Sequence, residues 1–422
     1  MSRFTIRSIN VPTPMATQDP FLFAVYHKDQ YPAGDDKMQA PRRGNGSDFD
    51  TSKPYRMYHG DRIPGFPQHP HRGFETITCT IEGTIDHTDS LGCGGRYGNG
   101  DLQWMTAGKG IVHGEMFPLV SKASEGNLNR FFQLWINLPS KSKMVSPNQL
   151  MHWSERVTRF TTLDTKTRAT VWAGNLHGHK ALDPIKDSWA NNPVNDVNIW
   201  FLQLQVGAKF VLPKSAQGSH RSLYLVEGNG ITLDESTKVP ASSMVEFKNA
   251  SETDVTVENT GGKDAEILIL QGKPIGEPVV QHGPFVMNTR EEIMQAFTDY
   301  RTTQFGGWPW PEDAMVFPRE KGRFLSLKGE PEELPPTTVA AFDQVTVPAK
   351  QAIPILLGFE AEDMAKAFSA QARKQVVTTQ AIKTLKLKLQ FDSPLHVSRC
   401  IVTLDLLYRN FGLPFLETIH LL

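Results

Sequence analysis

The stretch HPHRGFETITCTI, residues 69–81, is the most informative part of this sequence. It is rich in β-branched and aromatic residues and ends at Glu82-Gly83, which is typical of a β-strand followed by a turn. Side chains two residues apart on a strand point to the same face. His69 and His71 are therefore expected to lie side by side on one face.

A second segment, IVHGEM at residues 111–116, repeats this spacing with His113 and Glu115. Glycines crowd the sequence between the two segments, which indicates turns between short strands. If the two strands are antiparallel neighbours, three imidazoles and one carboxylate converge. These donors suit Fe, Mn, Ni, Cu or Zn, so the residues predict a transition-metal site without identifying the ion.

Glu75 is a competing carboxylate donor. On an uninterrupted strand it shares a face with His69 and His71, so it could reach the metal or accept a hydrogen bond that orients a histidine. We place Glu115 first because a single residue separates it from His113.

A second β-rich block, from about residue 198 to 271, repeats this organisation. Residues 223–231, LYLVEGNGI, follow the same order as residues 78–85: apolar strand, Glu-Gly turn, second strand. This pattern predicts an internal duplication. The second copy keeps His220 but has neither spaced pair, so we expect it to bind no metal. We interpret seven other histidines as structural: His59, His87, His152, His177, His179, His220 and His282.

Several long segments resemble the pirin family: HPHRGFETIT, DSLG, GDLQWMTAGKGIVHGEM, GPFVMNT and FGGWPW. The resemblance runs from Asp19 to about Gly322. It implies an all-β fold of two consecutive cupin (jelly-roll) β-barrels with a few short helices, and it leaves a C-terminal extension unexplained. It also implies a non-haem Fe(II) site, with other divalent metals as alternatives, whose ligands would be His69, His71, His113 and Glu115. Gly114 stands where the family usually has serine, but a side chain there would point away from the metal.

The resemblance implies two kinds of function. Several pirins resemble quercetin 2,3-dioxygenases, which implies a small aromatic substrate such as a flavonol, dioxygen as co-substrate, and Glu115 as the catalytic base. The alternative is an iron-dependent transcriptional co-regulator that binds a transcription factor in the nucleus.

The chain is long enough for more than one domain. We expect a metal-binding barrel over residues 1–140, with a first strand over residues 4–11. A second barrel without metal would span residues 141–323 and end in a short helix. A linker and an extension of unknown role would occupy residues 324–422.

The short helix is predicted over residues 288–300. Thr289 and Glu292 have the spacing of a capping box. The predicted apolar stripe consists of Ile293, Met294, Phe297 and Tyr300. In the extension, residues 360–374 are predicted as an amphipathic helix.

Composition limits the classes of partner. The formal net charge is -1, which predicts no direct binding to nucleic acid. No apolar run is long enough to span a membrane, and the first twenty residues lack the apolar core of a signal peptide. The three cysteines form no close motif. We therefore expect a cytoplasmic or nuclear protein, and a monomer.

Overall fold

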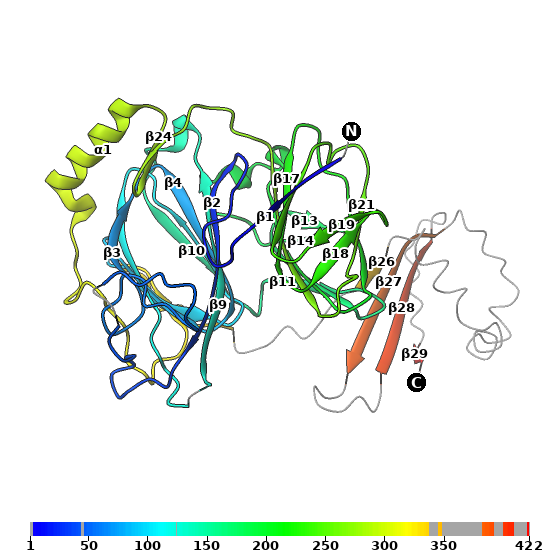
Figure 1. Ribbon diagram of the computed structural model, residues 1–422, viewed down its shortest axis with the longest axis horizontal. Coiled ribbons are helices and arrows are strands. Elements are labelled where there is room, and N and C mark those ends of the chain that lie inside the picture. Colours follow the sequence, from blue (N-terminus) through cyan, green and yellow to red (C-terminus); the bar gives the residue numbers. More distant parts are fainter. Residues whose placement is uncertain are drawn as a thin grey trace, which may run out of the picture.

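Two β-barrels lie side by side in the computed structural model (Figure 1). It describes residues 3–336, apart from 44, 45 and 124, together with four strands further along the chain. The predicted all-β fold is confirmed, and the described residues contain one α-helix. No helix among them is long and apolar enough to cross a membrane.

The first barrel consists of two five-stranded sheets. One has the order β10-β7-β4-β9-β2, with bounds Asn148–His152, Leu102–Thr106, Phe74–Glu82, Asn127–Asn137 and Phe21–Tyr31. The other has the order β25-β6-β5-β8-β3, with bounds Phe324–Ser326, Gly94–Gly98, Thr84–Asp89, Ile111–Met116 and Gly65–His71.

The second barrel has a seven-stranded and a four-stranded sheet. The larger sheet has the order β1-β20-β17-β22-β15-β12-β11, with bounds Phe4–Ser8, Ser243–Phe247, His220–Glu227, Ala265–Gly272, Asn198–Leu204, Thr167–Ala173 and Thr158–Thr161. The smaller sheet has the order β16-β21-β18-β19, with bounds Lys209–Leu212, Val255–Glu258, Gly230–Leu233 and Thr237–Pro240.

Strand order supports the predicted duplication. The order β7-β4-β9-β2 corresponds to β20-β17-β22-β15, and β6-β5-β8-β3 corresponds to β19-β18-β21-β16. The two barrels pack through a shared apolar core in which Phe132 of the first barrel lies 5.7 Å, between ring centroids, from Phe201 of the second.

The sheets do not follow the predicted boundaries at residues 140 and 323. β1 is the edge strand of the larger sheet of the second barrel and pairs with β20, while β10 is an edge strand of the first barrel and pairs with the corresponding strand β7. β25, which was assigned to the extension, pairs with β6 of the first barrel. Edge pairing joins segments far apart in sequence, so chain order alone does not determine it.

The remaining described elements are small. They are the hairpins β13 (Asn175–Leu176) with β14 (His179–Lys180) and β23 (Val280–His282) with β24 (Phe285–Met287), the helix α1 (Arg290–Thr303), and the 3₁₀ helices η1 (Ser140–Ser142), η2 (Trp189–Asn191), η3 (Pro193–Asn195) and η4 (Gln304–Gly306).

The predicted capping box of α1 is present. Thr289 Oγ1 accepts a hydrogen bond from the Glu292 amide, and the Glu292 carboxylate accepts one from the Thr289 amide. The predicted apolar stripe is wrong at Met294, whose side chain is exposed, because it lies one residue and therefore about 100° round the helix from the buried Ile293. The helix lies beside the first barrel rather than the second (Figure 1).

Part of the extension forms a four-stranded antiparallel sheet of order β26-β27-β28-β29, with bounds Val345–Val347, Ile382–Phe391, Cys400–Tyr408 and His420–Leu421. The predicted helix over residues 360–374 lies outside the described residues.

Candidate metal centre

Three predicted ligands converge inside the first barrel. β3 and β8 are antiparallel neighbours, and their register sets His69 directly opposite His113. His71 follows on the same face of β3. The candidate ligand atoms of the three residues all lie within 4.8 Å of one another. The strand alternation in the sequence therefore predicted this cluster correctly.

Backbone carbonyls orient two of these rings. His69 Nδ1 lies 2.9 Å from the Pro67 carbonyl oxygen, and His71 Nδ1 lies 3.3 Å from that of Pro284. A carbonyl can only accept, so each Nδ1 must carry the proton and donate it. The Nε2 atom of each ring is then left with a free lone pair, as in a metal-ligating histidine.

The hydrogen bonding of His113 indicates whether the site fits a metal ion. Its side chain is fully buried, and neither ring nitrogen has a hydrogen-bond partner among the residues that the structure describes. Buried polar groups nearly always have a partner, because an unsatisfied group costs about 1–3 kcal/mol. A metal ion bound through one nitrogen would provide that partner, so the three histidines fit a metal site.

Protonation favours the same conclusion. Burial lowers the pKa of His69 to about 4. Burial, with the neighbouring histidines, also holds the pKa of His71 and that of His113 well below the ordinary value. All three rings are neutral at physiological pH, and neutral imidazole is the form that binds metals.

Glu115 occupies the same interior but is not part of the three-histidine group. Its carboxylate accepts hydrogen bonds from Gln133 Nε2, at 2.9 Å and 3.1 Å, and from Thr78 Oγ1 at 3.2 Å. Burial raises the pKa of this carboxyl. Gln133 and Thr78 therefore fix a carboxylate beside the cluster.

Glu75 does not take part, which corrects the interpretation that it is a ligand or orients one. The chain turns at Gly73, where φ is +87°, so Glu75 lies on a different strand, β4, in the other sheet. Its carboxylate accepts hydrogen bonds from Trp104 Nε1 at 3.1 Å and Thr106 Oγ1 at 2.6 Å. The assumption of an uninterrupted strand was wrong.

The buried Glu75 carboxyl gives the protein a pH-dependent stability. Burial raises its pKa from 4.5 to about 7. Because the folded protein holds this proton more tightly than the unfolded chain, protonation of Glu75 favours the folded state. This contribution to the free energy of unfolding is fully present below pH 4.5 and is lost as the pH rises through 7. We expect Glu75→Gln to remove roughly 2–3 kcal/mol of pH dependence between pH 5 and 8, at about 1.36 kcal/mol per unit.

Urea unfolding at both pH values measures this effect as the difference between wild type and variant. The exposed Glu320→Gln is the matched control and should leave the pH dependence unchanged. Parallel pH curves for wild type and Glu75→Gln would show that Glu75 does not titrate in this range.

His87, which the sequence interpretation treats as structural, lies close to the cluster. It is fully buried on β5, opposite Glu115 in the register of β5 and β8. Its ring centroid lies 5.5 Å from that of His113, and its Nε2 lies 3.2 Å from Asp89 Oδ2. The spacing of His87 and Asp89 on one strand was a visible signal, but the pairing of β5 with β8 was not.

Aromatic side chains line one side of the cluster. The ring centroid of Trp135 lies 5.3 Å from that of His71, and Phe74 lies 5.0 Å from the same histidine. Trp135 is partly exposed and also contacts Phe23. A planar, apolar surface therefore adjoins the polar donors, as in many small-molecule sites.

The corresponding positions of the second barrel are apolar. β16 and β21 correspond to β3 and β8, and their inward residues belong to the core of that barrel. These residues are Phe210, Leu212, Val255 and Val257.

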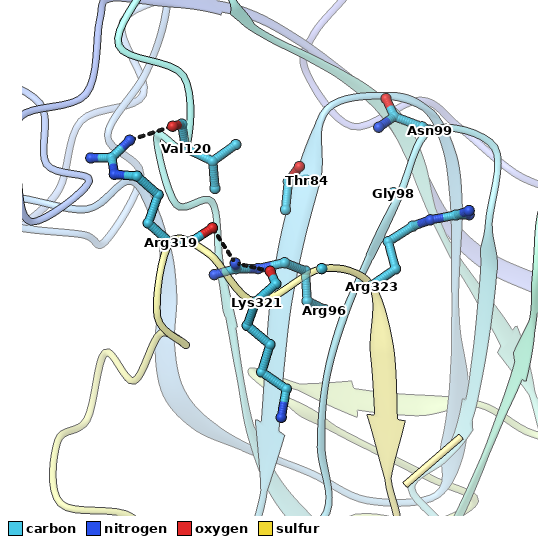
Figure 2. Close-up of a pocket in the computed structure, with 9 residues that line it drawn as sticks. Thr84, Arg96, Gly98, Asn99, Val120, Arg319, Lys321 and Arg323 are labelled. Atoms are coloured by element: carbon cyan, nitrogen blue, oxygen red, sulfur yellow. Dashed lines mark hydrogen bonds between the residues drawn. The ribbon is translucent and has the colours of Figure 1, made fainter. Parts of the chain in front are cut away.

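A separate surface cavity of about 180 Å³ is lined by several arginine and lysine side chains (Figure 2). None of the three clustered histidines lines it. Arg96 is paired with Asp86, Lys321 with Glu332, and Arg323 with Asp101 and Glu155. Arg319 donates to backbone carbonyls, including that of Val120. These positively charged side chains are therefore already bound to protein groups, and we do not assign an anion site to this cavity.

Comparison with known proteins agrees with this arrangement. Residues 7–136 match the family model of Pirin, and residues 199–306 match that of the Pirin C-terminal cupin domain. A Pseudomonas aeruginosa protein described as a putative quercetin 2,3-dioxygenase is 38% identical over 253 residues, which cover 60% of this chain and 82% of that protein. Pirin of Homo sapiens is 36% identical over 250 residues, covering 59% and 80% respectively. The crystal structure of quercetin 2,3-dioxygenase from Acinetobacter baumannii covers 72% of this chain and 97% of its own, with 26% identity and a TM-score of 0.55.

Proposed function

Because this chain belongs to the pirin family, and its relatives include proteins named as quercetin 2,3-dioxygenases, we propose that it is an Fe(II)-dependent dioxygenase that cleaves a flavonol. His69, His71 and His113 would hold the metal, and Glu115 would complete its ligand set or act as the catalytic base. The observation that carries the proposal is His113, a fully buried imidazole beside two oriented histidines, whose two nitrogens have no partner in the described part of the chain.

The donor set suits the proposed chemistry. Fe(II) held by these residues would supply the redox chemistry that dioxygen requires. Other divalent transition metals would fit the same nitrogen and oxygen donors.

The protein's own groups would prepare the substrate. Glu115 would take the proton of the flavonol 3-hydroxyl, and Gln133 and Thr78 would hold its carboxylate in place. The rings of Trp135 and Phe74 would lie along the planar substrate. In the proposed reaction, one flavonol and one dioxygen would give one ring-opened ester and one carbon monoxide, which carries away one carbon of the substrate.

Oxygen uptake tests the proposal. Protein loaded anaerobically with Fe(II) should consume dioxygen and release an equal amount of carbon monoxide when quercetin is added, and His113→Ala should do neither. One bound iron per chain without turnover would contradict flavonol cleavage. Failure to bind iron would contradict the metal site itself.

The alternative role, an iron-dependent co-regulator that binds a transcription factor in the nucleus, stays a prediction, since no contact among the described residues bears on it.

A further inference from the structure

The chain returns to the first barrel after the second barrel is complete. Residues 284–318, which we call the clasp, lie on the sheet that carries the ligands, and the helix α1 within it is seen beside β3 and β4 in Figure 1. The clasp was not needed to predict the ligands, yet it contacts three strands of the site.

The clasp touches both sides of the β3 ligand pair. On one side, the Pro284 carbonyl accepts the hydrogen bond from His71 Nδ1, and the Val286 amide donates to the Arg72 carbonyl at 3.0 Å. On the other side, Asp313 holds Gln68, the residue before His69. The Gln68 amide donates to the Asp313 carbonyl at 2.9 Å, and Gln68 Nε2 donates to Asp313 Oδ1 at 2.7 Å.

Arg72 connects the ligand strand to the helix of the clasp. Its Nη1 lies 2.7 Å from Asp299 Oδ2, and its guanidinium lies 4.6 Å from the centre of the Phe305 ring. Arg72 is buried, and its Nε donates to the Lys109 carbonyl at 2.7 Å. The end of β3 is therefore fixed by partners more than two hundred residues away.

The clasp also contacts the other two strands. Phe305 packs so closely on Gly110, next to β8, that a Cβ there would lie 2.6 Å from its ring. A Cβ at Gly114 would face Trp308 at 3.6 Å, so this position points towards the clasp, away from the cluster, as expected. On β5, Trp310 Nε1 donates to the Asp89 carbonyl at 2.9 Å.

We propose that the clasp positions the ligand histidines, so that the metal affinity of the first barrel depends on its docking. Groups that orient ligating histidines typically change metal affinity about 10–100-fold when lost. Coupling of this kind is reciprocal, so metal binding must also stabilise the docked clasp. The inference rests on the metal site of the proposed function but not on flavonol cleavage.

Co(II) titration of the full chain tests the inference. Asp299→Ala with Asp313→Ala removes the two side-chain anchors and should raise the Co(II) dissociation constant about 10–100-fold. The Co(II) visible spectrum should change with it, because ligand orientation changes. Asp299→Ala leaves the buried Arg72 without its carboxylate, but Arg72 keeps its hydrogen bond to the Lys109 carbonyl and its contact with Phe305. Affinity is therefore measured well below the melting temperature of the metal-free double variant.

Asp183→Ala is the matched control, since it removes an exposed ion pair with Lys180 on the second barrel. Hydrogen exchange gives a second measurement: Co(II) should slow exchange of the Val286 and Gln68 amides in the wild type. Unchanged affinity in the double variant, or unchanged exchange at both amides, would overturn the inference while the metal site stands. No Co(II) binding by the wild type would overturn both.

Discussion

His113→Leu is expected to abolish metal binding while leaving the metal-free protein at least as stable as the wild type. The wild-type imidazole is fully buried, and neither nitrogen has a partner within residues 3–336 or the other described strands. Without a cation this arrangement costs about 1–3 kcal/mol. Leucine has a similar volume and no polar atom, so it removes the cost without leaving a large cavity.

The loss of affinity should be large. Loss of a group that only hydrogen-bonds to a metal ligand changes the metal affinity by up to about 100-fold. Loss of a ligand itself should therefore reduce the affinity by more than that factor. Metal at 100 times its dissociation constant stabilises the wild type by about 2.7 kcal/mol, and this gain should vanish in the variant. Titration with Fe(II) or Co(II), and chemical unfolding with and without metal, measure the two effects.

His220→Leu is the matched control. His220 lies on β17 of the second barrel, and its Nδ1 lies 3.1 Å from the Asp19 carbonyl oxygen. This variant should lose a hydrogen bond and some stability, yet keep full metal affinity. If His113→Leu instead unfolded several kcal/mol more easily without metal, His113 would be a structural histidine.

Local alternation in the sequence was enough to find the three histidines. His69 and His71 lie on one strand, and His113 and Glu115 lie on another. The two side chains of each pair point to the same face because side chains alternate along a strand. The same reasoning failed for Glu75, because the backbone turns at Gly73. The alternation of side chains along β3 therefore does not continue into β4.

Other features depend on contacts that no short segment encodes. His87 lies opposite Glu115 because β5 pairs with β8, and β1 belongs to the second barrel because it pairs with β20. The clasp approaches from more than two hundred residues away. The sequence thus predicted that the three histidines converge, whereas the contacts that orient them could be found only in the fold.

Glu115→Gln is expected to reduce flavonol-dependent oxygen uptake by about 10²–10⁴-fold, the usual contribution of a general base. The change conserves shape. The glutamine oxygen can accept from Gln133 Nε2, and its amide group can donate to the Thr78 hydroxyl, which accepts as well as donates. Loss of turnover should therefore reflect lost basicity rather than a collapsed site.

Metal affinity measured on the same variant separates the two roles proposed for Glu115. If the carboxylate acts only as a base, Glu115→Gln keeps wild-type affinity and loses turnover. If it is also a ligand, affinity falls too, because a neutral amide is a weaker donor for a divalent cation. The present position of Glu115, outside the three-histidine group and held by Gln133 and Thr78, favours the first result. Full flavonol-cleaving activity in Glu115→Gln would contradict the assignment of Glu115 as the base. His87 would then be the next residue to replace, because it is the buried histidine opposite Glu115 on β5.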